Sequence, residues 1–238
     1  MTEELLAPLR EAPEQSAIIL DVDGTLAPIV ERPELAAVPE PTRQELVRLV
    51  GRYLLVACVS GRAGPDAERL VGVAGIHYVG NHGLELDPAA EDFAGRIAEF
   101  RTSVRLEVED KGLTLAYHLR GAPDERAARR VLEEVAARAR AEGLVTRWGR
   151  KVLEIRPPVE ADKGTAVRSL LAESAARRAL YGGDDTTDLD AFAGLASAGL
   201  DHFVRVAVVS DEAPPGLAES ADLVVENPVE LAALLARL

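Results

Sequence analysis

Short apolar runs alternate with helix-like segments over much of this chain, and each run ends in polar turn residues. Residues 16–20 form such a run and lead directly to Asp21 and Asp23, while residues 53–59 lead to a Ser-Gly-Arg turn. Between the two runs, residues 41–52 carry apolar side chains at helical spacing. Strands separated by helices favour a parallel sheet, because parallel neighbours need crossover connections. The pattern therefore predicts an α/β fold with a Rossmann-like parallel-sheet core.

The middle of the chain follows a different pattern. Two alternating runs flank a turn at 110–112, a long helix-like segment follows, and two more short strands come after it. The expected elements are strands at 104–109 and 113–119, a helix at 123–142, and strands at 144–148 and 152–155. This β-β-α-β-β order describes a small α+β domain inserted into the core. We therefore expect a discontinuous core at 1–83 and 160–238 and a cap domain at 84–159.

The net charge of −13, from 40 acidic and 27 basic residues, argues against partners that are themselves anionic. Nucleic acid and anionic membranes are therefore not expected to bind. No apolar run approaches the ~20 residues that span a bilayer, and residues 1–11 lack the basic start and apolar stretch of a secretory signal. The single cysteine, Cys58, leaves no internal disulfide possible. We expect a cytoplasmic protein; its oligomeric state is open, and a monomer is plausible.

Polar residues follow several of the predicted core strands, and ligands of open parallel sheets bind beyond these carboxyl ends. The residues are Asp21, Ser60, Asn81, His82 and Asp184. Each alone could be an ordinary turn, but together at one sheet edge they predict a binding site. Lys163, one of only three lysines in the chain, begins a predicted helix nearby and could make the site locally positive.

This set of residues suits phosphoryl transfer. The carboxylates of Asp21 and Asp184 are hard oxygen ligands for Mg²⁺, and the bound ion would allow Asp21 to attack phosphorus. The backbone carbonyl of Asp23 can join the metal ligands, while its side chain protonates the leaving oxygen and later activates water. Lys163 and Ser60 supply positive charge and hydrogen bonds for the phosphate oxygens. The sequence therefore predicts a magnesium-dependent enzyme that forms an aspartyl-phosphate.

Four motifs in this order resemble those of the haloacid dehalogenase superfamily: DVDGTL at 21–26, Ser60, Lys163 and GDD at 183–185. A narrower resemblance, to trehalose-6-phosphate phosphatases, covers most of the chain. It rests on DVDGTLAPI at 21–29, VSGR at 59–62, GNHGLE at 80–85, KVLEIRP at 151–157, DKGTA at 162–166 and GDDTTD at 183–188. In that family the inserted unit is a mobile cap that closes over the sugar, and the resemblance implies the same here.

The resemblance also implies catalytic and metal-binding roles. Asp21 would be the nucleophile, Asp23 the general acid and base, and Lys163 and Ser60 further catalytic residues. Mg²⁺ would be held by Asp21, Asp23 and Asp184, with Asp185 and Asp188 as supporting carboxylates. Without the resemblance, Asp185 and Asp188 are equally typical of helix caps.

The substrate-binding residues implied by the resemblance come from both expected domains. They are Arg62, Asn81 and His82 in the core and His118, Arg120, Lys151 and Glu154 in the cap. Taken alone, Asn81 and His82 could form a simple turn, and His118 and Glu154 could belong to a solvated strand face.

The expected activity is the hydrolysis of trehalose 6-phosphate to trehalose and inorganic phosphate. One alternative is a related phosphatase acting on glucosylglycerol, mannosylglycerate or sucrose phosphate. Two others are a phosphomutase, which also uses an aspartyl-phosphate, and a catalytically silent sugar-phosphate-binding protein. In each case the expected partner is a small-molecule sugar phosphate.

Overall fold

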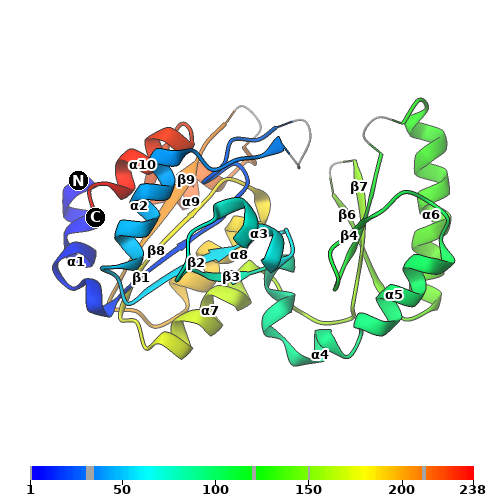
Figure 1. Cartoon of the computed structure of the whole chain (residues 1–238), viewed down its shortest axis with the longest axis horizontal. Helices are drawn as coiled ribbons and strands as arrows, with labels where there is room; N and C mark the ends of the chain where they lie inside the picture. Colours follow the sequence, from blue (N-terminus) through cyan, green and yellow to red (C-terminus); the bar gives the residue numbers. More distant parts are fainter. Residues whose placement is uncertain (1, 31–34, 120–121, 150, 211–212) are drawn as a thin grey trace. The chain divides into compact units, whose positions relative to one another are not determined.

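The computed structural model describes residues 2–30, 35–119, 122–149, 151–210 and 213–238. The chain divides into two compact units (Figure 1): a larger one, Met1–Leu86 with Ala161–Leu238, and a smaller one, Asp87–Glu160. Each unit has its own hydrophobic core. That the larger unit is a catalytic core and the smaller one a cap stays a prediction, because the division into compact units does not show what each unit does.

The described residues of the larger unit form a six-stranded sheet in the order β10-β9-β8-β1-β2-β3. All neighbouring strands in it are parallel. The strands are β1 Ser16–Leu20, β2 Leu55–Val59, β3 His77–Val79, β8 Arg178–Gly183, β9 His202–Val208 and β10 Leu223–Val225. This arrangement confirms the expected parallel-sheet α/β core.

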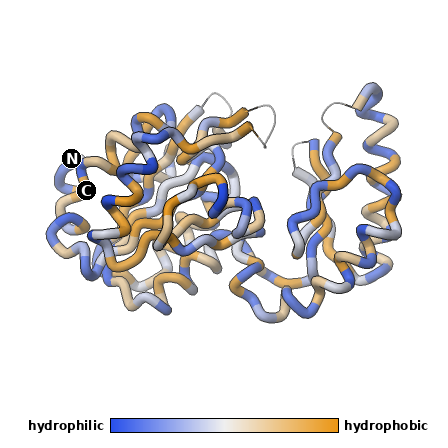
Figure 2. The backbone as a smooth tube through the Cα atoms, in the orientation of Figure 1, coloured by the Kyte–Doolittle hydropathy of each residue, from blue (hydrophilic) through white to orange (hydrophobic). Residues whose placement is uncertain are grey.

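Helices cover both faces of this sheet because its strands are apolar on both sides. Figure 2 shows hydrophobic residues along these strands. Along β1, Ile18 and Leu20 pack into one core, whereas Ala17 and Ile19 pack into the other, as the two-residue period of a strand requires. The first core also receives apolar residues from α1 Thr2–Glu11, α2 Glu40–Val50, α3 Gly64–Val71 and α10 Pro228–Leu235. The second receives them from α7 Lys163–Ser174, α8 Thr186–Ala196 and α9 Leu217–Ser220. Short 3₁₀ segments are η1 Pro13–Gln15 and η3 Asn81–Leu86.

The smaller unit is an antiparallel four-stranded sheet, in the order β4-β5-β7-β6, with helices on one face. Its elements are α4 Pro88–Glu91, α5 Ala94–Ser103, β4 Glu109–Asp110, β5 Leu115–His118, α6 Glu125–Ala141, β6 Val145–Gly149 and β7 Val152–Arg156. Leu115 and Tyr117 of β5 and Leu153 and Ile155 of β7 point into the core beneath α5 and α6. The expected smaller α+β insertion is thereby confirmed as a fold.

One local expectation for this unit is wrong, and two of its helices were not anticipated. The segment 104–109 was expected to be a strand, but only Glu109 pairs with β5, together with Asp110. Val104 and Val108 instead pack against the helical core of the unit without strand pairing. Helices α4 and α5 also precede the β-β-α-β-β series, because Ile97 and Phe100 bury one face of α5. Among the helices of the described residues, none is long and apolar enough to cross a bilayer.

Candidate active site

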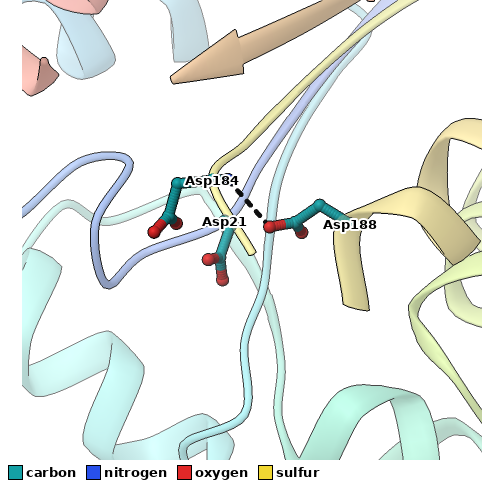
Figure 3. Close-up of side chains that lie close together, drawn as sticks. All are labelled: Asp21, Asp184 and Asp188. Atoms are coloured by element: carbon teal, nitrogen blue, oxygen red, sulfur yellow. Dashed lines mark hydrogen bonds between the residues drawn. The ribbon is translucent and has the colours of Figure 1, made fainter. Parts of the chain in front are cut away.

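Two neighbouring strands bring Asp21 and Asp184 together (Figure 3). Asp21 follows β1, and its backbone N–H donates to the carbonyl of Gly182 in β8 over 2.8 Å. Asp184 follows β8 directly. Because β1 and β8 are parallel and in register, both carboxylates lie beyond the same edge of the sheet.

Asp188 completes a group of three carboxylates with Asp21 and Asp184. One oxygen from each lies within 4.8 Å of the others. Adjacent ligand oxygens of a six-coordinate Mg²⁺ ion lie about 3 Å apart and opposite ones about 4.2 Å, so these carboxylates are near enough to contribute to one cation site. The hard oxygen donors also match the preference of Mg²⁺. Among the described residues, Asp188 is therefore the third carboxylate of this group. The sequence predicted it only as a supporting carboxylate of the metal site.

Lys163 neutralises part of this negative charge. Its Nζ lies 2.9 Å from Asp21 Oδ1 and 2.7 Å from Asp188 Oδ1, and the side chain is 2% exposed. The position follows from the start of α7, where Asp162 and Thr165 form a capping box immediately around Lys163. Burial alone would lower the pKa of Lys163, but the charges of Asp188 and Asp21 outweigh it and raise the pKa.

Asp188 is fully buried and accepts four hydrogen bonds at its two oxygens, including the one from Lys163. Oδ1 accepts from Lys163 Nζ and, over 2.6 Å, from the hydroxyl of Tyr181. Oδ2 accepts from the backbone N–H groups of Asp184 and Asp185 at 2.9 and 2.8 Å. The position also belongs to the capping box of α8, whose N-cap is Asp185. Asp188 is therefore both part of the α8 helix cap and part of the candidate site, so the two interpretations do not exclude each other.

The pKa values of Asp21 and Asp184 are both raised, first by burial and then by the neighbouring carboxylates. Burial raises the pKa of Asp21, Lys163 opposes the rise, and the charges of Asp188 and Asp184 add to it. Burial and the charge of Asp188 raise the pKa of Asp184 to about 7, against the hydrogen bond that it accepts from the Thr25 hydroxyl over 3.0 Å. A divalent cation would stabilise the ionised carboxylates.

Asp23 and Arg62 form a bidentate ion pair. Arg62 Nε and Nη2 donate to Asp23 Oδ2 and Oδ1, each over 2.6 Å. Arg62 follows β2, so the pair links the loops after β1 and β2. The backbone N–H of Arg62 donates to Ser60 Oγ over 3.1 Å, and Ser60 is 1% exposed. The structure thus places Ser60 and Arg62 at the same sheet edge as Asp21.

Asn81 and His82 follow β3 in a tight turn with left-handed backbone angles, φ 52° and 54°. The N–H of Asn81 donates to the carbonyl of Arg62, and that of His82 donates to the carbonyl of Ser60. The loops after β2 and β3 are therefore held together by backbone hydrogen bonds. The expected site residues of the larger unit that follow β1, β2 and β3 lie on these connected loops, whereas Lys163 begins α7 and Asp188 lies in α8.

The site residues expected in the cap belong to the smaller unit. His118 of β5 lies opposite Val152, and Glu154 of β7 lies opposite Ala116, so both project from the sheet face away from the helices. His118 Nε2 lies 2.8 Å from Glu109 Oε2. Lys151 Nζ, in the β6–β7 turn, lies 2.6 Å from Glu125 Oε1, and Arg120 falls outside the described residues. The substrate-binding role of these residues stays a prediction.

The family model described as trehalose-phosphatase matches residues 19–95 and 98–223. The chain belongs to the trehalose-phosphatase family. A trehalose-phosphate phosphatase from Mycobacterium marinum is 31% identical over 244 residues, covering 93% of this chain and 61% of the relative. The chain spans 50–67% of the length of the first relatives that it matches.

Solved structures support the fold of this trehalose-phosphatase family member. A crystal structure titled as a trehalose-6-phosphate phosphatase related protein is 26% identical, with a TM-score of 0.74 over 92% of this chain and 95% of that one. A haloacid dehalogenase-like hydrolase from Bacteroides thetaiotaomicron is 17% identical, with a TM-score of 0.61 over 93% and 98% of the two chains. The second shares the fold alone, and the expected haloacid dehalogenase-like architecture is confirmed.

Sequence reasoning did not single out three side chains of this family member that hydrogen-bond to expected site residues: Thr25, Tyr181 and Glu85. Thr25 donates to Asp184, and Tyr181 donates to Asp188. The one available signal for Tyr181 was a hydroxyl inside an otherwise apolar strand, three residues before Asp184. Glu85 was part of the GNHGLE stretch but had no assigned role.

Proposed function

We propose that this protein hydrolyses trehalose 6-phosphate to trehalose and inorganic phosphate. The observation that carries the proposal is the close arrangement of Asp21, Lys163, Asp184 and Asp188 beyond the strand ends of a trehalose-phosphatase family member. A carboxylate beside a fixed ammonium and two further carboxylates suits an aspartyl-phosphate reaction better than passive sugar binding.

In the first step, an oxygen of Asp21 attacks phosphorus, and the bond between phosphorus and the sugar oxygen breaks. Lys163 orients the attacking carboxylate and offsets negative charge on the phosphate. Asp23 delivers a proton to the departing sugar oxygen. Because Asp23 now shares both oxygens with Arg62, this ion pair has to open before Asp23 can donate.

In the second step, water attacks the phosphorus of the aspartyl-phosphate and Asp23 accepts its proton. The bond between phosphorus and Asp21 breaks, which releases orthophosphate and restores the carboxylate. When bound, Mg²⁺ would be held by the carboxylates of Asp21 and Asp184 and by the backbone carbonyl of Asp23, with Asp188 as a supporting carboxylate, and would neutralise charge on the phosphate. Asp185 would support this group through the N–H that it donates to Asp188.

Substrate binding is the finer part of the proposal. Arg62, Asn81 and His82 would contact the substrate from the larger unit, and His118, Arg120, Lys151 and Glu154 from the smaller one. Sugar hydroxyls are suitable partners for the charged groups of Lys151 and Glu154. A cytoplasmic location and the lack of nucleic-acid and membrane partners stay predictions, and the oligomeric state stays open.

The decisive test is phosphate release from a panel of sugar phosphates in Mg²⁺ and in EDTA. The panel contains trehalose, sucrose, glucose, glucosylglycerol and mannosylglycerate phosphates. We expect kcat/KM for trehalose 6-phosphate to exceed the others by about a hundredfold, a gap of ~2.7 kcal/mol in transition-state binding. A higher kcat/KM for another sugar phosphate would overturn the proposed substrate. Transfer of the phosphate group to another position of the sugar, with no inorganic phosphate released, would indicate a mutase.

The covalent step has its own test in Asp21→Asn, with the exposed Asp92→Asn as control. An amide cannot form the aspartyl-phosphate, so turnover should fall by more than about a thousandfold while sugar-phosphate binding remains measurable. Asp92→Asn should leave both unchanged. Undiminished turnover in Asp21→Asn would contradict the mechanism, and absence of turnover in the unsubstituted protein would favour a silent binding protein.

A further inference from the structure

Glu85 accepts hydrogen bonds from two different loops. Its Oε1 accepts from the backbone N–H of Gly64 over 2.8 Å and from the Asn81 side-chain amide over 3.0 Å. Its Oε2 accepts from the backbone N–H of Gly80 over 2.9 Å. Gly64 lies in the connection after β2, whereas Gly80 and Asn81 lie in the connection after β3. One carboxylate therefore joins these two connections.

The two glycines are needed for this contact. A Cβ atom added to Gly64 would overlap Glu85 Oε2, and one added to Gly80 would overlap both Glu85 Oε1 and the backbone of Gly64. The two backbones and the carboxylate are therefore packed so closely that no side chain fits between them.

Glu85 also supplies a helix cap. Gly64 begins α3, and the N-cap residue Ala63 makes no side-chain cap hydrogen bond. Glu85 accepts the hydrogen bond from the first N–H of α3 in its place, and its negative charge lies where the helix dipole favours it. The start of α3 is thus fixed by a residue from another loop.

The turn that Glu85 holds carries two residues in an unfavourable backbone conformation. Asn81 and His82 both have positive φ angles, which non-glycine residues seldom adopt. Such a turn persists only where its surroundings determine it, and Glu85 contributes two of the hydrogen bonds that do so. Asn81 and His82, together with Arg62, are the core residues proposed to contact the substrate.

We propose that Glu85 is a positioning residue for substrate binding. It holds the connections after β2 and β3 in one rigid arrangement, so that Arg62, Asn81 and His82 meet the sugar phosphate in a preformed geometry. Glu85 acts through these residues and does not itself contact the substrate. This inference rests on the proposed phosphatase function.

The test is Glu85→Gln, with Glu68→Gln as its matched control on the exposed surface of α3. A glutamine amide nitrogen cannot accept, so at least one of the three donors loses its partner. We expect KM for trehalose 6-phosphate to rise about tenfold and kcat to change less than twofold, the signature of lost uniform binding. Glu68→Gln should change neither. A merely structural role would lower kcat through loss of folded enzyme and leave KM unaltered, which would overturn the proposal.

A second variant separates geometry from charge. Glu85→Asp keeps the carboxylate but shortens its reach by one methylene, so it cannot satisfy both connections at once. We expect the same direction of change in KM as for Glu85→Gln. Full wild-type KM in Glu85→Asp would contradict the need for this geometry.

Amide NMR of Gly64 and Gly80 gives a readout that does not depend on activity. At least one of the two N–H signals should move upfield in Glu85→Gln, and both should stay in place in Glu68→Gln. Moved signals with unchanged KM would overturn the positioning role, and unmoved signals would show that Glu85 does not hold these loops. Inactivity of the unsubstituted protein towards every sugar phosphate would instead overturn the proposed function, and with it a substrate-binding role for Glu85.

Discussion

Lys163 lies between Asp21 and Asp188 in a region closed to solvent, where each charge depends on its partner. Replacing Lys163 with methionine keeps most of the side-chain volume but leaves two buried carboxylates without a counter-charge. We expect the free energy of unfolding, measured without Mg²⁺, to fall by about 3 kcal/mol. This value is the lower end of the range found when a buried ion pair loses one partner.

Urea denaturation followed by circular dichroism measures this change. Arg168→Met is the matched control, because Arg168 is exposed on the same helix, α7. A loss below about 1 kcal/mol in Lys163→Met would show that the ion pair is not buried as described. Lys163→Arg should also lose activity, since a planar guanidinium does not fit the place of an ammonium.

The raised pKa of Asp184, about 7, predicts how stability varies with pH when no cation is bound. Between about pH 4 and 7 the folded protein holds a proton on Asp184 that the unfolded chain has lost. Stability from this group is therefore complete below the unfolded pKa and declines as the pH rises towards 7. The predicted decline is on the order of 4 kcal/mol over the whole range, and about 3 kcal/mol of it falls between pH 5 and pH 7.5.

The comparison is between unsubstituted protein and Asp184→Asn, by urea denaturation in EDTA at pH 5 and pH 7.5. The asparagine variant should lose less stability over this interval, because it has no proton to release at this position. Saturating Mg²⁺ should remove the decline in the unsubstituted protein. Equal pH dependence of both proteins in EDTA would contradict the raised pKa.

At the scale of elements, helix α7 ends in a residue that is poorly suited to its backbone. Ala175 forms the C-cap with φ 57° and ψ 27°, a left-handed conformation that glycine adopts without steric cost. We expect Ala175→Gly to raise the free energy of unfolding by about 0.5–1 kcal/mol. Ala172→Gly, within the same helix, should lower it by a similar amount. A destabilising effect of Ala175→Gly would disprove the assigned conformation.

The sequence predicts the core elements better than those of the smaller unit. The run SAIIL corresponds residue for residue to β1, because a fully buried parallel strand is apolar throughout. The alternation at 104–109 suggested a strand, but pairing also requires a neighbouring strand, and β5 offers one only from Glu109. Helix α5 was missed because just two buried residues, Ile97 and Phe100, mark its inner face.

The same distinction applies to the site. The strand ends at Asp21 and Asp184 follow from the sheet pattern, so their meeting could be expected from the sequence. The contacts of Tyr181 with Asp188 and of Glu85 with Gly64 depend on how separate loops pack, and a linear pattern carries little information about such packing.

At the scale of the whole molecule, the two units have separate cores, and the only tryptophan, Trp148, packs against the core of the smaller one. Phe100, fully buried in that core, can be replaced by alanine at an expected cost of about 3–4 kcal/mol. We expect Phe100→Ala to move the Trp148 fluorescence transition to lower urea while the main circular dichroism transition moves less.

Phe192→Ala, in the core of the larger unit, is the complementary control. It should move the circular dichroism transition and leave the Trp148 transition nearly in place. Coincident shifts of both signals in both variants would mean that the chain unfolds as one cooperative whole.

The pairing of β1 with β8 also has a consequence for how the protein is made. Strand β1 ends at Leu20, but its partner β8 begins only at Arg178, after the entire smaller unit. At the usual speed of translation, β1 waits roughly 10–30 s for this neighbour. The smaller unit is a continuous stretch and can fold on the ribosome during that interval, whereas the first three strands keep an unpaired apolar edge. Nascent chains that have not yet reached β8 are therefore the stage of this protein's life at which protection by chaperones matters most.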